Sequence, residues 1–227
     1  MTGPPPGARL VDLSHPVQDG MPVHPGDPAV HLRPAATLAE HGYNVLHVHL
    51  GSHSGTHVDA PYHFVADGAR VDELPLGLFV GPAVVADVRG VGPRGRIGWA
   101  HLEPWAALLG PGRPLVLRTG WSEHWGSDRY ADHPFLTGDA ARRLVAAGVR
   151  TVGVDAFSVD ETVTSGVPAD GFPAHEALLG AGGVVVENLT NLAALDGVAD
   201  PWLSVLPLRL AGADGAPVRA VALLPAR

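Results

Sequence analysis

The stretch His53-Ser54-Gly55-Thr56-His57-Val58-Asp59-Ala60-Pro61-Tyr62-His63 places three histidines and one aspartate within eleven residues. His53 and His57 stand four residues apart, a spacing that zinc enzymes often place on one face of a helix. Gly55, the β-branched residues beside it and Pro61 all disfavour a helix. We therefore predict a glycine-containing turn followed by extended chain.

In such an extended chain His57, Asp59 and His63 fall on one side, because alternate residues of a strand share a face. The turn can bring His53 to the same place. Two imidazoles and one carboxylate then form a three-ligand metal site with an open position, which is typical of catalytic metals, and we predict His53, His57 and Asp59 as ligands. His63 suits either a fourth ligand or a proton-transfer group, and the residues alone leave both roles open.

The composition bounds the class of protein. The chain has 227 residues, 46% of them hydrophobic, which suffices for one sizeable core, so we expect residues 1–227 to form a single domain. There are 23 acidic residues against 15 lysines and arginines, and the formal charge of -8 makes nucleic acids and anionic membranes unexpected partners. A small-molecule substrate is the default. Because cysteine is absent, a transition metal must be held by imidazole and carboxylate.

The ends of the chain and its hydropathy predict a location. Residues 1–7 contain no basic segment followed by an apolar run, and no apolar stretch approaches the ~20 residues of a membrane span. We expect a cytoplasmic protein without a membrane segment, whose residues 1–8 are flexible.

Apolar runs predict strands and helices along the chain. Residues 9–13, 45–53, 83–88, 114–119, 150–155 and 184–187 read as strands, and residues 99–109, 140–147 and 174–180 as helices. Thr137 can cap the second helix and Gly148 can end it, which makes residues 114–155 a βαβ unit. Ala213-Asp214-Gly215 reads as a hairpin turn. The mixture predicts an α/β domain with parallel and antiparallel pairing.

The string His53-Ser-Gly-Thr-His57-Val-Asp59-Ala-Pro-Tyr-His63 closely resembles the His-x-Gly-Thr-His-x-Asp-x-Pro-x-His signature of the metal-dependent cyclase-like family. That family includes bacterial kynurenine formamidases and isatin hydrolases. Val11-Asp12-Leu13-Ser14, Pro22-Val-His-Pro-Gly-Asp27 and the segment from Val154 to Asp160 resemble further parts of it, so the likeness covers nearly the whole chain.

The resemblance implies a fold, a site and a reaction. It implies a swivelling β/β/α fold with a mixed sheet, and a homodimer or homotetramer. His175 and Glu187, twelve residues apart, would complete the metal site, with Asp59 and Glu187 bridging two divalent ions, and His63 would transfer the proton. Zn²⁺ suits this ligand set and Mn²⁺ is the alternative. The implied activity is hydrolysis of the C–N bond of a small N-acyl or cyclic aromatic amide, by hydroxide held on the metal.

Other readings stay open from the sequence. A metal-dependent cyclase of secondary metabolism shares the signature, and a non-catalytic binding protein is a third possibility. His24 stands where kynurenine formamidases of the family carry tryptophan, so the substrate is less determined than the reaction. His24 and Phe157 are candidate substrate-binding residues. The segment 162–172 either covers the pocket or is an ordinary loop, and residues 121–125 either meet a ligand or fill the core.

Overall fold

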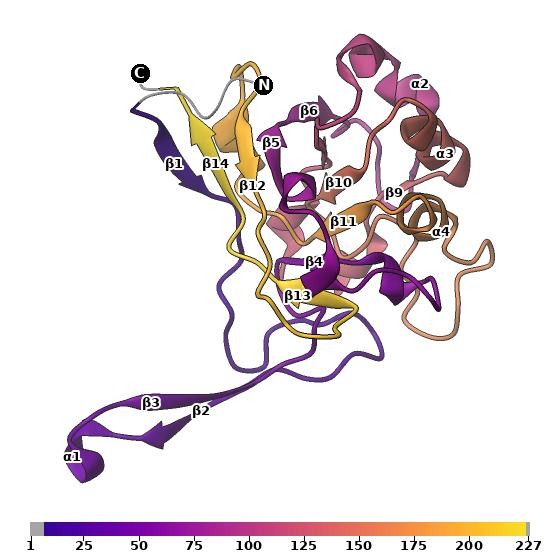
Figure 1. The fold of residues 1–227 in the computed structure, drawn as a ribbon. Helices are drawn as coiled ribbons and strands as arrows, with labels where there is room; N and C mark the ends of the chain where they lie inside the picture. Colours follow the sequence, from indigo (N-terminus) through magenta and orange to yellow (C-terminus); the bar gives the residue numbers. More distant parts are fainter. Residues whose placement is uncertain (1–6, 226–227) are drawn as a thin grey trace.

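Six strands form the central sheet of the computed structural model, which describes residues 7–225 (Figure 1). Their order across the sheet is β13 (Gly215–Pro217), β4 (His57–Asp59), β11 (Val184–Glu187), β10 (Thr151–Val154), β8 (Leu115–Arg118) and β6 (Val84–Asp87). The last four run parallel, while β4 is antiparallel to both of its neighbours. The predicted mixed sheet is confirmed.

Three helices cover one face of this sheet: α2 (Trp99–Leu102), α3 (Gly138–Ala146) and α4 (Pro173–Gly180) (Figure 1). The predicted βαβ unit is confirmed as β8, α3 and β10. The Thr137 side chain accepts a hydrogen bond from the Ala140 amide, so it caps α3 as expected, and Gly148 follows the helix with φ 90. Leu144 of α3 packs with strand residues Leu115 and Val152 in one buried core.

A second sheet covers the other face. Its strands, all antiparallel, are in order β1 (Arg9–Asp12), β14 (Val221–Leu224), β12 (Trp202–Ser204) and β5 (Val80–Pro82). Val11 and Leu203 from this sheet share a buried core with Val116 and Val186 of the central sheet. Alternate residues of the central strands therefore serve two cores, and the order of layers is β/β/α, as the resemblance implied.

The remaining elements lie outside these layers. β2 (His31–Ala36) and β3 (Val45–His49) form a hairpin with α1 (Leu38–His41) at its tip, and this arm projects from the body (Figure 1). β7 (Arg96–Ile97) pairs with β9 (Phe135–Leu136). The 3-10 helices are η1 (Pro61–His63), η2 (Val71–Glu73), η3 (Leu76–Leu78), η4 (Glu103–Leu108), η5 (Trp121–His124), η6 (Asp128–Asp132) and η7 (Leu192–Leu195).

Three sequence predictions need correction. The strand predicted for residues 45–53 ends at His49, and its side chains are exposed on the arm. The extended chain predicted through His63 stops at Ala60, because Pro61 fits the first position of a 3-10 turn. The helix predicted for residues 99–109 is α2 followed by η4, since Pro104 lacks the amide that a continuous helix would need.

Two expectations concern the ends and the membrane. The flexible start predicted for residues 1–8 falls mostly on residues 1–6, which lie outside the described part of the chain. Among the described residues, no helix has the length and hydropathy needed to cross a membrane.

Candidate active site

The signature stretch supplies side chains to the site from a turn and from strand β4. Gly55 has φ 66, a left-handed conformation that a residue with a side chain rarely adopts, and it makes the turn between His53 and β4. β4 then places His57 and Asp59 two residues apart on one face of the sheet. Both side chains are buried, so the centre of the sequence motif lies in the interior, while His63 at its end is exposed.

β11 and α4 supply the two predicted ligand residues that lie far from the signature stretch in the sequence. Glu187 ends β11 directly opposite His57 in the antiparallel register, and the buried His175 lies in the first turn of α4. The Asp160 carboxylate accepts hydrogen bonds from the Ala174 and His175 amides, each 2.9 Å long, and so fixes the start of α4. All five predicted ligand residues therefore converge in the fold.

The inward-facing atoms of the cluster have nearly uniform spacing. His57 Nε2 lies 3.3 Å from Asp59 Oδ1 and 3.5 Å from Glu187 Oε2. His175 Nε2 lies 3.4 Å from Asp59 Oδ2 and 3.3 Å from Glu187 Oε1. Ligands at 2.0–2.2 Å around a tetrahedral ion are separated by about 3.3–3.6 Å. His53 Nδ1 is nearer to Asp59 Oδ1, at 2.6 Å.

Each of the three histidines has an acceptor on its outward nitrogen. His57 Nδ1 donates to the Gly55 carbonyl at 2.8 Å, and His175 Nδ1 lies 2.8 Å from Asp160 Oδ2. His53 Nε2 lies 2.9 Å from Asp214 Oδ2. Outer partners of this kind fix the tautomer of metal-ligating histidines.

In the neutral tautomers that these outward bonds favour, the inner nitrogens present lone pairs to carboxylate oxygens. Asp59 Oδ2 is buried and has no hydrogen-bond partner, which is costly for a carboxylate in the interior. One proton on one imidazole can fill only one of these contacts. A divalent cation satisfies all of them at once, so the donor set fits a metal of the kind that imidazole and carboxylate bind.

The carboxylates also favour positive charge here. Burial opposes charging of His53, but its hydrogen bonds to Asp214 and Asp59 outweigh burial and raise its pKa to about 10. Burial likewise opposes charging of His175, yet its carboxylate neighbours raise the pKa of that imidazole well above its usual range. The local potential therefore stabilises a cation among the five side chains.

His63 stands at the mouth of the cluster, on η1. Its ring centroid is 4.0 Å from that of His53, and its Nδ1 lies 3.5 Å from Asp214 Oδ2, which leaves Nε2 for other partners. Burial lowers the pKa of His63 below its usual value. The neutral imidazole can take up a proton and release it.

A cavity of about 190 Å³ opens beside this cluster, and both predicted substrate-binding residues, His24 and Phe157, line it. Phe64 and Phe172 add two further aromatic rings, so part of the segment 162–172 does face the cavity. Trp121, by contrast, is buried and donates from Nε1 to the carbonyls of Arg129 and Tyr130, which is a core role.

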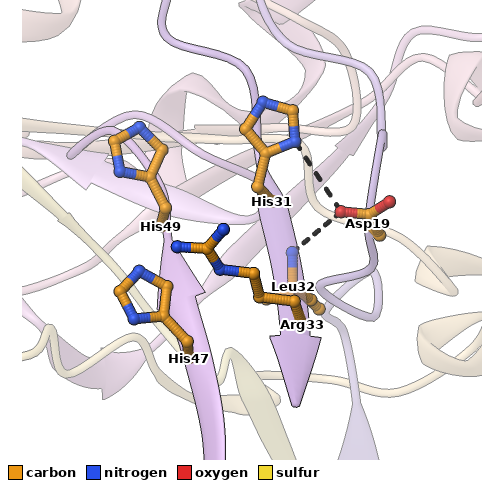
Figure 2. A pocket seen from close by; sticks show the side chains of 6 residues that line it. All are labelled: Asp19, His31, Leu32, Arg33, His47 and His49. Atoms are coloured by element: carbon orange, nitrogen blue, oxygen red, sulfur yellow. Dashed lines mark hydrogen bonds and ion pairs between the residues drawn. The ribbon is translucent and has the colours of Figure 1, made fainter. Parts of the chain in front are cut away.

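Figure 2 shows the histidines of the projecting arm. His47 and His49 lie on β3 beside Arg33 and His31 of β2. The Asp19 carboxylate lies next to His31, 3.8 Å from its Nδ1. None of these residues belongs to the three groups of converging potential ligands found among residues 7–225. In a strand running from 45 to 53, His47, His49 and His53 would share one face, but β3 ends at His49. His53 reaches the site through the turn at Gly55 instead.

The structure adds two carboxylates that the sequence did not reveal. Asp160, within the segment that resembles the family, has Oδ2 2.8 Å from His175 Nδ1, while Asp214 has Oδ2 2.9 Å from His53 Nε2. Asp214 stood in a predicted hairpin turn, and the chain does reverse there, with Pro207 bridging Val218. The strand that follows, β13, pairs with β4 instead, and this pairing carries Asp214 to the site. No local sequence signal marks it.

Known proteins resemble this chain along most of its length. The Cyclase family model, described as "Putative cyclase", matches residues 11–161. Kynurenine formamidase of Bacillus cytotoxicus is 37% identical over 218 residues, covering 94% of this chain and 97% of the relative. Kynurenine formamidase of Sphingopyxis alaskensis is 36% identical over 220 residues, with the same two coverages.

Solved structures agree with these relatives. Isatin hydrolase A from Labrenzia aggregata superposes with a TM-score of 0.87 at 26% identity, covering 96% of this chain and 94% of that one. A potential metal-dependent hydrolase with cyclase activity superposes with a TM-score of 0.76 at 26% identity, covering 97% and 100%. The shared fold therefore includes the layers that carry the cluster.

Proposed function

Because this chain belongs to the Cyclase family, we propose that it hydrolyses the C–N bond of a small N-acyl or cyclic aromatic amide with a divalent metal ion. The observation that carries this proposal is the convergence of the His57 and His175 imidazoles with the Asp59 and Glu187 carboxylates, at the separations expected of ligands around one metal ion. An aromatic cavity lies directly beside these side chains. A metal hydrolase needs both features, a cation site and a place for the substrate.

His53, His57 and Asp59 are the proposed ligands of one ion, and Asp59, His175 and Glu187 those of a second. Asp59 belongs to both groups, and Glu187 lies within 3.5 Å of His57 as well as of His175, which supports a bridging role for both carboxylates. Zn²⁺ is the expected ion and Mn²⁺ the alternative. When bound, such an ion polarises a carbonyl group and makes water a better nucleophile.

His63 moves the proton that the reaction requires. Water attacks the carbonyl carbon and loses a proton, which His63 accepts at Nε2 and passes to the amide nitrogen as the C–N bond breaks. An N-acyl amide gives an amine and a carboxylic acid, and a lactam gives one ring-opened product that carries both groups. An amine leaves from a tetrahedral centre only when its nitrogen is protonated, so this transfer is essential for amides.

The cavity suggests the size of the substrate. A volume of about 190 Å³ is close to the ~150 Å³ that encloses benzene in a protein core. His24 and Phe172 also line an adjoining cavity of about 340 Å³, which gives room for a substituent. We therefore propose aryl formamides and isatin-like lactams, with the ring held between Phe64, Phe157 and Phe172.

Restoring activity with metal tests this function. Protein stripped with a chelator is expected to hydrolyse N-formylkynurenine, formanilide or isatin only after Zn²⁺ or Mn²⁺ is added, which absorbance or product chromatography measures. Metal without protein is the control. Absence of turnover above that control for every substrate would contradict the proposal, and ring closure of a polyketide-like precursor without hydrolysis would favour a cyclase.

We also propose that the chain works as a single hydrolase domain within a homodimer. The two hydrophobic cores share the central sheet, which supports one domain. The arm exposes Leu46 and Val48 to 53% and 51%, and an isolated two-stranded hairpin is marginally stable in water. Packing of this apolar face on a second copy stabilises the arm.

Charges on the arm test the dimer. The double variant Leu46→Glu, Val48→Glu is expected to be monomeric at micromolar concentration while the wild type is dimeric, because burying two carboxylates in an apolar contact is costly. Light scattering after size exclusion measures the mass. Leu76→Glu, a single substitution of the same kind at a residue 69% exposed on η3, is expected to remain dimeric. A monomeric wild type, or a dimer unaffected by the arm substitutions, would refute this assembly.

A further inference from the structure

Both oxygens of the Asp214 carboxylate contact side chains on the outer side of the site. Oδ2 lies 2.9 Å from His53 Nε2 and 3.5 Å from His63 Nδ1, while Oδ1 accepts a 2.9 Å hydrogen bond from Ser52 Oγ. The Asp214 carbonyl also accepts from the Ala60 amide at 2.8 Å. One side chain thus contacts a proposed metal ligand and the proposed proton carrier.

Gly215 provides the space that this arrangement needs. A Cβ atom at this position would lie 2.8 Å from His53 Cε1 and 2.6 Å from the Val58 carbonyl oxygen, both closer than real contacts allow. The His53 ring therefore packs directly on the backbone of β13. Gly215 lies opposite Asp59 in the pairing of β13 with β4. Asp214 and Gly215 therefore both contact the His53 ring, one through its carboxylate and the other through its backbone.

We propose that Asp214 is a positioning residue that orients His53 toward the metal and holds His63 beside it. The proposal deepens the proposed function and depends on its metal site. An imidazole can present either nitrogen to a metal, and the other nitrogen then carries a proton that needs an acceptor. Asp214 accepts that proton at Nε2 of His53, so Nδ1, which lies 2.6 Å from Asp59 Oδ1, would be the nitrogen that presents its lone pair to a bound metal.

The same carboxylate selects the working nitrogen of His63. With Nδ1 directed toward Asp214 Oδ2, Nε2 of His63 is the nitrogen available to the substrate. One oxygen of Asp214 thus contacts both rings, whose planes are inclined by 31° to each other. Loss of the carboxylate is expected to free both rings, weakening metal binding and slowing proton transfer together.

Substitution of Asp214, with metal affinity as the main measurement, tests this role. Asp214→Ala is expected to bind Zn²⁺ about 10- to 100-fold more weakly than the wild type, as for other outer partners of ligating histidines, in competition with a chromophoric chelator. At saturating metal its kcat is expected to fall while KM stays within about threefold. Asp214→Asn keeps an oxygen that can accept from His53, and its loss of affinity is expected to be smaller.

Asp72→Asn is the matched control. The Asp72 carboxylate accepts a hydrogen bond from the Gly212 amide and so ties down the same loop without touching either histidine. Its metal affinity is expected to match the wild type. Equal loss in Asp72→Asn and Asp214→Ala would assign Asp214 to general loop stability and overturn the proposal. Gly215→Ala, which displaces the ring sterically, is expected to weaken metal binding as well.

Other outcomes separate this proposal from the proposed function. Unchanged affinity in Asp214→Ala overturns the positioning role, and loss of one whole equivalent of metal at saturation makes Asp214 a ligand instead. A wild type that binds Zn²⁺ but hydrolyses no amide contradicts the proposed function, while the affinity comparison still decides the role of Asp214. A wild type that binds no divalent metal overturns both.

Discussion

Asp59→Asn is expected to lower kcat/KM for an aryl formamide by about 10⁴-fold, the range seen when one member of a catalytic unit is removed. Asp59 contributes an oxygen to both ligand groups, so its loss weakens both ion positions at once. An asparagine has one carbonyl oxygen without a full charge and cannot replace a bridging carboxylate. Steady-state kinetics and metal content of the purified variant measure the effect.

The metal-free protein should lose stability as well. Burial opposes ionisation of Asp59, but the histidines around it hold the pKa of this carboxyl well below its usual value, so the neutral amide removes a charge that stabilises the folded state. Thermal unfolding in chelator measures this. Asp87→Asn, at the half-exposed end of β6, is the control and should retain activity. Wild-type metal content in Asp59→Asn would contradict the bridging role.

His63→Ala is expected to lower kcat for formanilide by roughly 10²- to 10⁴-fold, the usual contribution of a general acid or base. An ester such as phenyl formate should lose much less, because phenolate leaves without protonation. Metal affinity should stay near the wild-type value. The ratio of the amide and ester effects, measured at saturating Zn²⁺, isolates proton transfer from substrate binding.

The same variant decides between the two roles that the sequence left open for His63. A loss of metal affinity comparable to that of His57→Ala would identify His63 as a fourth ligand. Equal losses for amide and ester would exclude selective protonation of the leaving group. His47→Ala on the exposed arm is the control, and its kinetics should match those of the wild type.

Much of the fold could be predicted from local sequence. Strands such as β10 and β11 are short apolar runs that end at turns, and α3 has a capping threonine before it and a glycine after it. These signals act within a few residues of each other, so the sequence shows them directly. Two predicted elements end elsewhere because of proline. Pro61 begins a 3-10 turn where an extended chain was predicted, and Pro104 divides the helix predicted for residues 99–109.

The arm shows where a periodic pattern misleads. Alternation in residues 45–49 is the same for an exposed hairpin as for a strand with one face in the core. Val45, Leu46 and Val48 are all exposed, so the pattern did predict a strand but could not say what it packs against. β3 pairs with β2 in the arm, where His47 lies opposite Arg33 and His49 opposite His31, and neither histidine belongs to a group of converging ligands among residues 7–225.

By itself, the sequence determined which residue types are available for chemistry. The close spacing of His53, His57 and Asp59 identified them as candidate ligands, and resemblance extended the set to His175 and Glu187. Tertiary structure alone decided the outer partners. Asp214 reaches His53 because β13 pairs with β4, a contact between segments more than 150 residues apart in the chain. Backbone hydrogen bonds in a sheet join strands without regard to their distance in sequence, so no local pattern could reveal that carboxylate.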